Sequence, residues 1–234
     1  MESNINIKDN FKRVMDRIKE AAIRSNRKPD DVKLVAVSKT VDIKRILEAV
    51  DAGATILGEN YVQEALQKIP AVPSDVNWHM IGHLQKNKVK YVIEPFSLIH
   101  SVDSEKIANE IQKRGAQKGK KVDILIEVNL SGEESKFGTP PEDLPLLVES
   151  IAKMDHLNLL GLMTMPPFFS DPEKSRPFFA KLRELLDKLN EQRIYPFPLK
   201  ELSMGMSNDF FEAILEGATM VRVGTAIFGE RKNK

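Results

Sequence analysis

Short apolar segments alternate with amphipathic segments along almost the whole chain. Eight segments have the length and composition of buried strands: residues 33–39, 55–58, 78–82, 98–102, 123–130, 159–165, 200–205 and 220–224. Between them apolar side chains recur at helical spacing. In residues 6–25 this spacing predicts a first helix with one buried stripe, formed by Phe11, Val14, Ile18 and Ala22. The chain therefore repeats a strand-then-helix unit eight times.

Three of the later predicted helices have recognisable first residues. Asp42, Ser104 and Ser207 each precede a helical pattern, and their side chains can accept hydrogen bonds from the free N–H groups of a first turn. Gly53 predicts the end of the helix that begins at Asp42.

Strict alternation of strands and helices predicts a parallel sheet, because parallel strands need helical crossovers. Eight units within 234 residues match the size of a (β/α)8 TIM barrel. The alternative is an open, doubly wound sheet, and the absence of a glycine-rich GxGxxG turn favours the barrel. We expect an α/β protein with a single domain over residues 1–234.

Composition excludes several classes of function. The 35 Lys and Arg residues balance 34 Asp and Glu residues, so nothing indicates binding to nucleic acid or another polyanion. The absence of cysteine excludes disulfides, thiolate metal sites and cysteine nucleophiles. The first residues do not resemble a signal peptide, and no apolar run could span a bilayer. We expect a soluble, cytoplasmic protein with no membrane partner.

Lys39 ends the apolar segment “LVAVSKT”, residues 34–40. In a strand it would share a face with Val35 and Val37, so in a barrel it would point into the mouth, where active sites lie. A partly desolvated lysine is more readily neutral and can form a Schiff base with an aldehyde. The alternative is that Lys39 emerges into solvent or pairs with Glu59.

Two loops near the end of the chain are candidates for binding phosphate. “SMGMSND”, residues 203–209, leads into the helix predicted at Ser207, and a helix N-terminus attracts anions. “VRVGTAIFG”, residues 221–229, supplies Gly224 and Thr225 after the eighth strand. Barrels often bind phosphate with the loops after strands seven and eight. For Ser207 the alternative is ordinary helix capping.

Arg222 alternates with Val221 and Val223 in a strand that should be buried on both faces. A buried guanidinium needs acceptors. They could come from a ligand, or from an ion pair with Glu201 or Glu127, and the pattern does not separate these alternatives.

Two weaker signals favour ordinary structural roles. His79 and His83 are four residues apart, which suits a metal only on a helix, whereas “WHMIGH” has a strand pattern. Lys136, in “ESKFG” after the fifth strand, is interpreted as a surface lysine, although it could be a second site of ligand attachment.

The motifs together resemble one family. “AVSKT”, “GENYVQE”, “WHMIGHLQKNK”, “SVDS”, “EVNLSGEESKFG”, “GLMTM”, “LSMGMSNDFFEAI” and “VRVGTAIFG” occur in the order found in the pyridoxal phosphate homeostasis proteins, from about residue 30 to residue 229. The resemblance implies a barrel similar to the N-terminal domain of alanine racemase. It also implies that the cofactor is pyridoxal 5'-phosphate (PLP), held as a Schiff base on Lys39.

The resemblance assigns the remaining cofactor-binding residues by motif. Ser207, Gly224 and Thr225 would hold the phosphate, with Ser203 in the same region. Around the ring, Arg222 would face the pyridine nitrogen, and Asn60 and Met165 would lie nearby.

The resemblance implies a carrier that takes part in vitamin B6 homeostasis, without catalytic turnover and without catalytic residues. PLP-dependent apo-enzymes would be its recipients, and we expect a monomer. The alternative is an amino-acid racemase, for which alanine racemase uses a tyrosine as the second base. The three tyrosines here, Tyr61, Tyr91 and Tyr195, lie in no matching segment.

Overall fold

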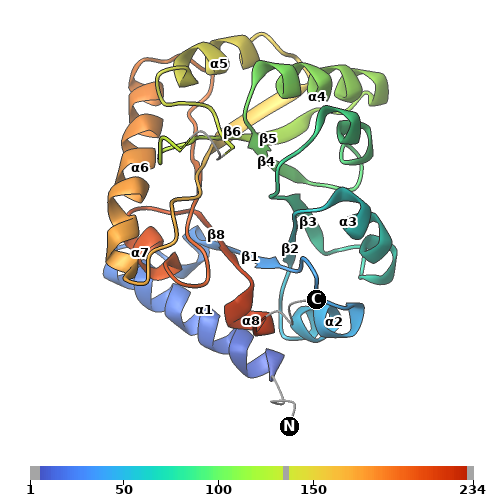
Figure 1. Ribbon diagram of the computed structural model, residues 1–234, viewed down its shortest axis with the longest axis vertical. Helices are drawn as coiled ribbons and strands as arrows, with labels where there is room; N and C mark the ends of the chain where they lie inside the picture. Colours follow the sequence, from blue (N-terminus) through green and yellow to red (C-terminus); the bar gives the residue numbers. More distant parts are fainter. Residues whose placement is uncertain (1–5, 134–136, 231–234) are drawn as a thin grey trace.

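A computed structural model describes residues 6–133 and 137–230 of the chain, and its eight parallel strands close into a barrel (Figure 1). The strands follow one another around the barrel in chain order, and β1 also pairs with β8. They are β1 (Lys33–Val37), β2 (Ile56–Glu59), β3 (Asn77–Met80), β4 (Leu98–Val102), β5 (Val122–Glu127), β6 (Leu157–Met163), β7 (Glu201–Ser203) and β8 (Met220–Val223). The predicted (β/α)8 barrel is confirmed, and the open sheet is wrong.

Helices surround the strands, as Figure 1 shows. The α-helices are α1 (Ile7–Arg24), α2 (Ile43–Asp51), α3 (Val62–Lys68), α4 (Glu105–Lys118), α5 (Leu144–Ile151), α6 (Arg176–Glu191), α7 (Phe210–Leu215) and α8 (Thr225–Phe228). Short 3-10 helices are η1 (Pro29–Asp31), η2 (Ile69–Ala71), η3 (Lys86–Tyr91) and η4 (Pro172–Ser175). Among the described residues no helix is long and apolar enough to cross a membrane.

The first helix forms as its pattern predicts. Asn6 caps α1 by accepting a hydrogen bond from the Asp9 N–H, and the predicted stripe is buried. Asp42 likewise caps α2, through the Arg45 N–H. Helix α1 packs beside α7 and α8 in Figure 1, and the Arg17 guanidinium lies 4.9 Å from the centre of the Phe210 ring.

Alternate residues of each strand face opposite sides of the barrel wall. Outward-facing residues such as Ala36, Leu57 and Val223 join the large core beneath the helices. Inward-facing Val35 and Val37 form a separate small cluster with Ile81 inside the barrel. This alternation brings Lys39 to the mouth side, above Val37.

Six of the eight strands end earlier than their apolar pattern predicts, whereas β4 ends at Val102 as predicted and β2 ends one residue later, at Glu59. Strand β1 ends at Val37, and Ser38 to Thr40 form a turn in which Thr40 adopts a positive φ of 62°. A hydrophobic pattern does not encode such a turn. Lys39 therefore follows the strand instead of ending it.

The helix predicted to begin at Ser207 begins instead at Phe210. Gly205 adopts a φ of 89°, and a Cβ there would lie 2.5 Å from that of Ala213, so the chain turns tightly before the helix. The Asp209 carboxylate accepts a hydrogen bond from the Met206 N–H and closes the turn. Ser207 is therefore not the residue that caps this helix.

Candidate functional site

A pocket of about 250 Å³ opens at the carboxyl ends of the strands, where barrel enzymes and binding proteins keep their sites. It brings together seven of the eight residues proposed from the sequence: Lys39, Asn60, Met165, Ser207, Arg222, Gly224 and Thr225. The eighth, Ser203, lies beneath the pocket and is fully buried. Positions separated by up to 186 residues of chain (39 to 225) thus meet at one mouth.

Lys39 lines this pocket together with the apolar side chains of Val37 and Ile81, and it is half-buried. Glu59, which the sequence suggested as an acidic partner, lies on the helix-facing side of the wall. Its carboxylate accepts hydrogen bonds from Lys68 and Ser38.

The two candidate phosphate loops meet directly. The Ser207 hydroxyl oxygen accepts hydrogen bonds from the Gly224 N–H, at 3.1 Å, and from the Ala226 N–H, at 3.3 Å. These N–H groups belong to the first turn of α8, so they converge toward the pocket side of Ser207. A hydroxyl that accepts two bonds keeps its own proton for donation. The arrangement supplies several donors to one small volume, as an anion requires.

Arg222 projects inward from β8 and is only 3% exposed. Its guanidinium donates to the Ser203 hydroxyl, at 2.5 Å, and to the Thr164 carbonyl, at 2.9 Å. Burial lowers the pKa of Arg222 to about 10, against opposing effects of Glu127 and Asp209. Arg222 is therefore still protonated at neutral pH.

Neither glutamate considered from the sequence hydrogen-bonds to Arg222. Glu201 pairs with Lys33 at 2.6 Å. Glu127 acts on Arg222 through its charge, and burial raises the pKa of Glu127 itself to about 7. Two of the five guanidinium N–H groups are used by neutral partners, and Arg222 lines the pocket.

A buried chain of hydrogen bonds continues behind Arg222. His100 Nδ1 lies 2.9 Å from the Ser203 hydroxyl, and His100 Nε2 lies 2.9 Å from His79 Nδ1. Burial lowers the pKa of His79 to about 3 and that of His100 well below its usual value, so both rings are neutral. Arg222 can only donate, so the proton of buried Ser203 pairs best with His100 Nδ1. His100 Nε2 then donates to His79.

Neither His100 nor the role of His79 was predicted from the sequence. Both project inward by the period of two along β3 and β4, which was the available signal. The pairing of His100 with Ser203 and with His79 depends on closure of the barrel and has no local signal.

Asn60 and Met165 lie on opposite sides of the mouth. The Oδ1 of Asn60 is buried and has no hydrogen-bond partner among the described residues, so it is an acceptor that a ligand could use. Gly82 permits this position, since a Cβ there would lie 2.5 Å from the Asn60 carbonyl oxygen. Met165 is 40% exposed, beside the still more exposed Phe168.

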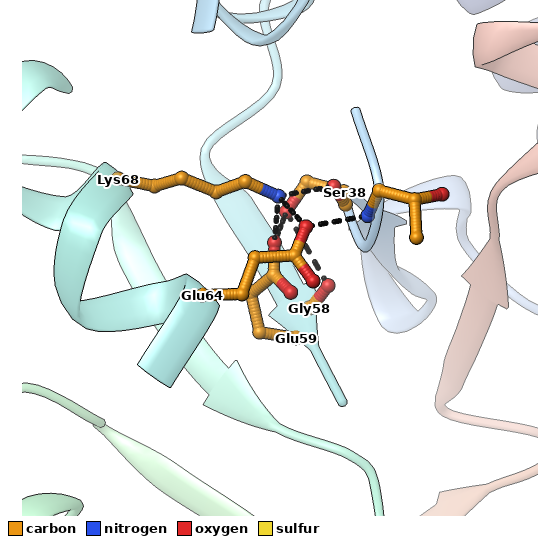
Figure 2. A network of polar contacts seen from close by, with 6 residues as sticks. Ser38, Gly58, Glu59, Glu64 and Lys68 are labelled. Atoms are coloured by element: carbon orange, nitrogen blue, oxygen red, sulfur yellow. Dashed lines mark hydrogen bonds and ion pairs between the residues drawn. The ribbon is translucent and has the colours of Figure 1, made fainter. Parts of the chain in front are cut away.

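A second polar cluster lies on the outer side of the wall, next to the turn that carries Lys39. Figure 2 shows Lys68 reaching from α3 to Ser38, Glu59 and Glu64. Glu64 also accepts a hydrogen bond from the Thr40 N–H, at 2.5 Å. Burial raises the pKa of Glu59, and the Lys68 ammonium opposes that effect. No pattern in the sequence predicted this cluster.

The remaining candidates lie elsewhere. His83 stacks on Phe137, with ring centres 3.7 Å apart, and pairs with Asp103, whereas His79 contacts His100. The described residues contain no group of three or more His, Cys, Asp or Glu suited to a metal ion. Lys136 lies outside the described residues.

The fold and the mouth of the barrel define the class of protein. Residues 6–232 match the family described as “Alanine racemase, N-terminal domain”, whose barrel this structure shares. The chain is also 48% identical over 229 residues to the pyridoxal phosphate homeostasis protein of Aquifex aeolicus, covering 97% of this chain and 100% of that one. The chain belongs to the pyridoxal phosphate homeostasis proteins.

Solved structures agree with this assignment. A protein of unknown function from Bifidobacterium adolescentis is 38% identical, with a TM-score of 0.87 over 95% of this chain and 94% of that one. PipY of Synechococcus elongatus, solved with PLP bound, is 36% identical, with a TM-score of 0.80 over 92% of this chain and 100% of PipY.

Proposed function

We propose that this protein binds PLP at the barrel mouth, attached to Lys39 as a Schiff base, and acts in intracellular PLP homeostasis without catalytic turnover. The observation that carries the proposal is the convergence of a lysine, two donor-rich loops and a buried arginine on one pocket. The names of the relatives and the PLP bound to PipY support it.

The chemistry of the pocket fits the parts of PLP. Ser207, Gly224 and Thr225 line the pocket and are the residues for the phosphate, and the Ser207 hydroxyl, which accepts from the Gly224 and Ala226 N–H groups, can donate its own proton to it. Asn60 Oδ1 is the buried acceptor that lacks a partner, and Met165 covers the ring region. Ser203 acts indirectly, by holding Arg222.

Bound PLP supplies an aldehyde carbon. The Lys39 amine condenses with it: a C=N bond replaces the C=O bond, and the oxygen leaves as water with both amine protons. Val37 and Ile81 form apolar walls of the pocket beside Lys39.

Arg222 argues against strong catalytic activity. Its pKa of about 10 keeps it protonated, so it can donate to a pyridine nitrogen but cannot accept a proton from it. A ring kept unprotonated is a weak electron sink, and carbanion chemistry is limited.

The alternative, an amino-acid racemase, needs a second base. Tyr195 is engaged at the other end of the barrel, where its hydroxyl accepts a hydrogen bond from the Leu159 N–H. Tyr61 follows Asn60 and lines an adjoining hollow, so it is the tyrosine to test. Loss of a measurable racemase activity in Tyr61→Phe would favour the alternative.

The decisive experiment compares wild type with Lys39→Ala after incubation with PLP. We expect wild type to absorb near about 420 nm and the variant to lack this band. After borohydride reduction, peptide mass mapping should place the adduct on Lys39. A wild-type protein without the band would overturn the proposal, and an adduct on Lys136 instead would overturn the assignment to Lys39.

The proposal has three further parts. We propose that residues 1–234 form one PLP-binding domain, that the protein is a cytoplasmic monomer, and that it passes PLP to PLP-dependent apo-enzymes. Light scattering tests the monomer. Reactivation of a PLP-dependent apo-enzyme by the loaded protein, faster than by the PLP it releases into solution, tests the transfer.

A further inference from the structure

The turn that carries Lys39 is tied to helix α3 on both sides of the lysine. On the preceding side, the Ser38 carbonyl accepts a hydrogen bond from Lys68 Nζ, at 2.7 Å. On the following side, the Thr40 N–H donates to Glu64 Oε1, at 2.5 Å. The peptide groups before and after Lys39 are therefore both held by residues of one helix (Figure 2).

This turn needs support, because its backbone is strained. Thr40 adopts a φ of 62°, in the left-handed region, where a β-branched side chain is unfavourable by about 1–2 kcal/mol. Such a conformation persists only when its surroundings hold it. The hydrogen bond from Thr40 to Glu64 is one such restraint.

The cluster that holds the turn is itself rigid. The Lys68 ammonium has three N–H groups and contacts three acceptors: the Ser38 carbonyl, Glu59 at 2.8 Å and Glu64 at 2.5 Å. The Lys68 side chain is 8% exposed and that of Glu59 is fully buried. The Ser38 hydroxyl adds a hydrogen bond to Glu59, at 2.7 Å.

We propose that Glu64 and Lys68 are positioning residues for Lys39, which hold its turn so that the amine meets the aldehyde of a bound ligand. Neither residue is among those that line the pocket. They should therefore affect the rate of covalent attachment and leave noncovalent binding of the phosphate and ring unchanged. The inference rests on the proposed function, because it takes Lys39 as the attachment site.

The experiment compares wild type with Glu64→Ala and Glu64→Gln. Two probes separate the steps: PLP, whose attachment gives the absorbance band, and pyridoxine 5'-phosphate, which has no aldehyde and binds only noncovalently. Stopped-flow absorbance gives the rate of attachment, and calorimetry gives the Kd of pyridoxine 5'-phosphate. Amide hydrogen exchange at Thr40 reports the turn directly.

We expect Glu64→Ala to slow attachment by about tenfold or more, because small misplacements of a reacting group greatly reduce rates. Its Kd for pyridoxine 5'-phosphate should stay within about twofold of wild type, and the Thr40 amide should lose protection. Glu64→Gln should recover most of the rate, since its amide oxygen still accepts from Thr40 and Lys68.

Glu110→Ala is the matched control. Glu110 is also mostly buried and also pairs with a cation four residues later, Arg114, but it lies on α4. It should attach PLP at the wild-type rate. Equal rates in wild type and Glu64→Ala would overturn the positioning role alone, as would an equal slowing in Glu110→Ala. A wild-type protein that never forms the band would overturn the proposed function and this inference together.

Discussion

The barrel wall separates two buried cations that are satisfied in different ways. Inside the barrel, Arg222 donates to a hydroxyl and a carbonyl. The neutral histidines His100 and His79 continue the series of hydrogen bonds from that hydroxyl. Outside, Lys68 donates to two carboxylates as well as a carbonyl. The charge of Lys68 is compensated by direct ion pairs, whereas the direct hydrogen-bond partners of Arg222 are neutral and the carboxylates of Glu127 and Asp209 act on it from a distance.

The difference indicates what each cation is for. A cation whose direct partners are neutral and which faces a pocket remains attractive to an acceptor or anion that enters it. A cation that already contacts two carboxylates attracts a further anion only weakly, so its main role is to maintain the local geometry. The partners of Arg222 thus suit the binding site that we propose, and those of Lys68 suit its proposed support of the Lys39 turn.

The largest expected effect comes from removing the compensated cation. Lys68→Met would leave the Glu59 and Glu64 carboxylates close together without their counter-ion. We expect a loss of about 3–5 kcal/mol in the free energy of unfolding, measured by urea denaturation.

Lys12→Met is the control for this change, because Lys12 forms an exposed pair with Asp16. It should leave the free energy of unfolding almost unchanged, because solvent screens an exposed ion pair. Equal shifts in Lys12→Met and Lys68→Met would remove the distinction between the Lys68 cluster and an ordinary surface ion pair.

The free energy of unfolding should vary with pH because of Glu127, which lies in the interior of the barrel. Burial raises the pKa of Glu127 from 4.5 to about 7, so the folded protein binds this proton more tightly than the unfolded chain. The resulting stabilisation is full below about pH 4.5 and is lost as the pH rises through about 7, a change of about 3 kcal/mol.

Glu127→Gln should abolish this contribution, and the measurement is the difference between its urea-unfolding profile and that of wild type from pH 4.5 to 7.5. The neutral histidines contribute to the pH dependence of stability with the opposite sign, since their stabilisation is lost as the pH falls below about 6.5. Their contribution is the same in wild type and Glu127→Gln, so it cancels in the difference between the two profiles. Glu48→Gln, an exposed change on α2, should follow wild type. A Glu127→Gln profile parallel to wild type would contradict the prediction.

The smallest effect concerns the link between Arg222 and the histidines. Ser203→Ala would leave buried donors and acceptors on Arg222 and His100 without this partner. We expect a loss of about 1–3 kcal/mol in the free energy of unfolding. In Ser97→Ala, where the hydroxyl of an exposed serine donates to the Trp78 carbonyl, the loss should be smaller. A Ser203→Ala protein as stable as wild type would show that the hydrogen bonds of Ser203 to Arg222 and His100 do not contribute to stability.

Much of the fold could be predicted because its signals are local. The burial of Val14 and Ile18 follows from helical spacing, and the cap at Asp42 from its position before a helix. The inward direction of Val35, Val37 and Arg222 follows from the period of two. The ends of β1 and β7 and the start of α7 were misplaced because positive φ angles at Thr40 and Gly205 have no hydrophobic signature.

The sequence by itself determined that eight strand-helix units form a closed parallel barrel, and that Lys39, Arg222 and the two serine- and glycine-containing loops come after or within strands that meet at one mouth. Only the tertiary structure decided which side chains support them. His100 meets Ser203 across 103 residues, and Lys68 reaches Ser38 across 30. The physical reason is that periodicity sets the direction of a side chain, whereas its partner depends on the register of neighbouring strands and on how each helix packs against the closed wall.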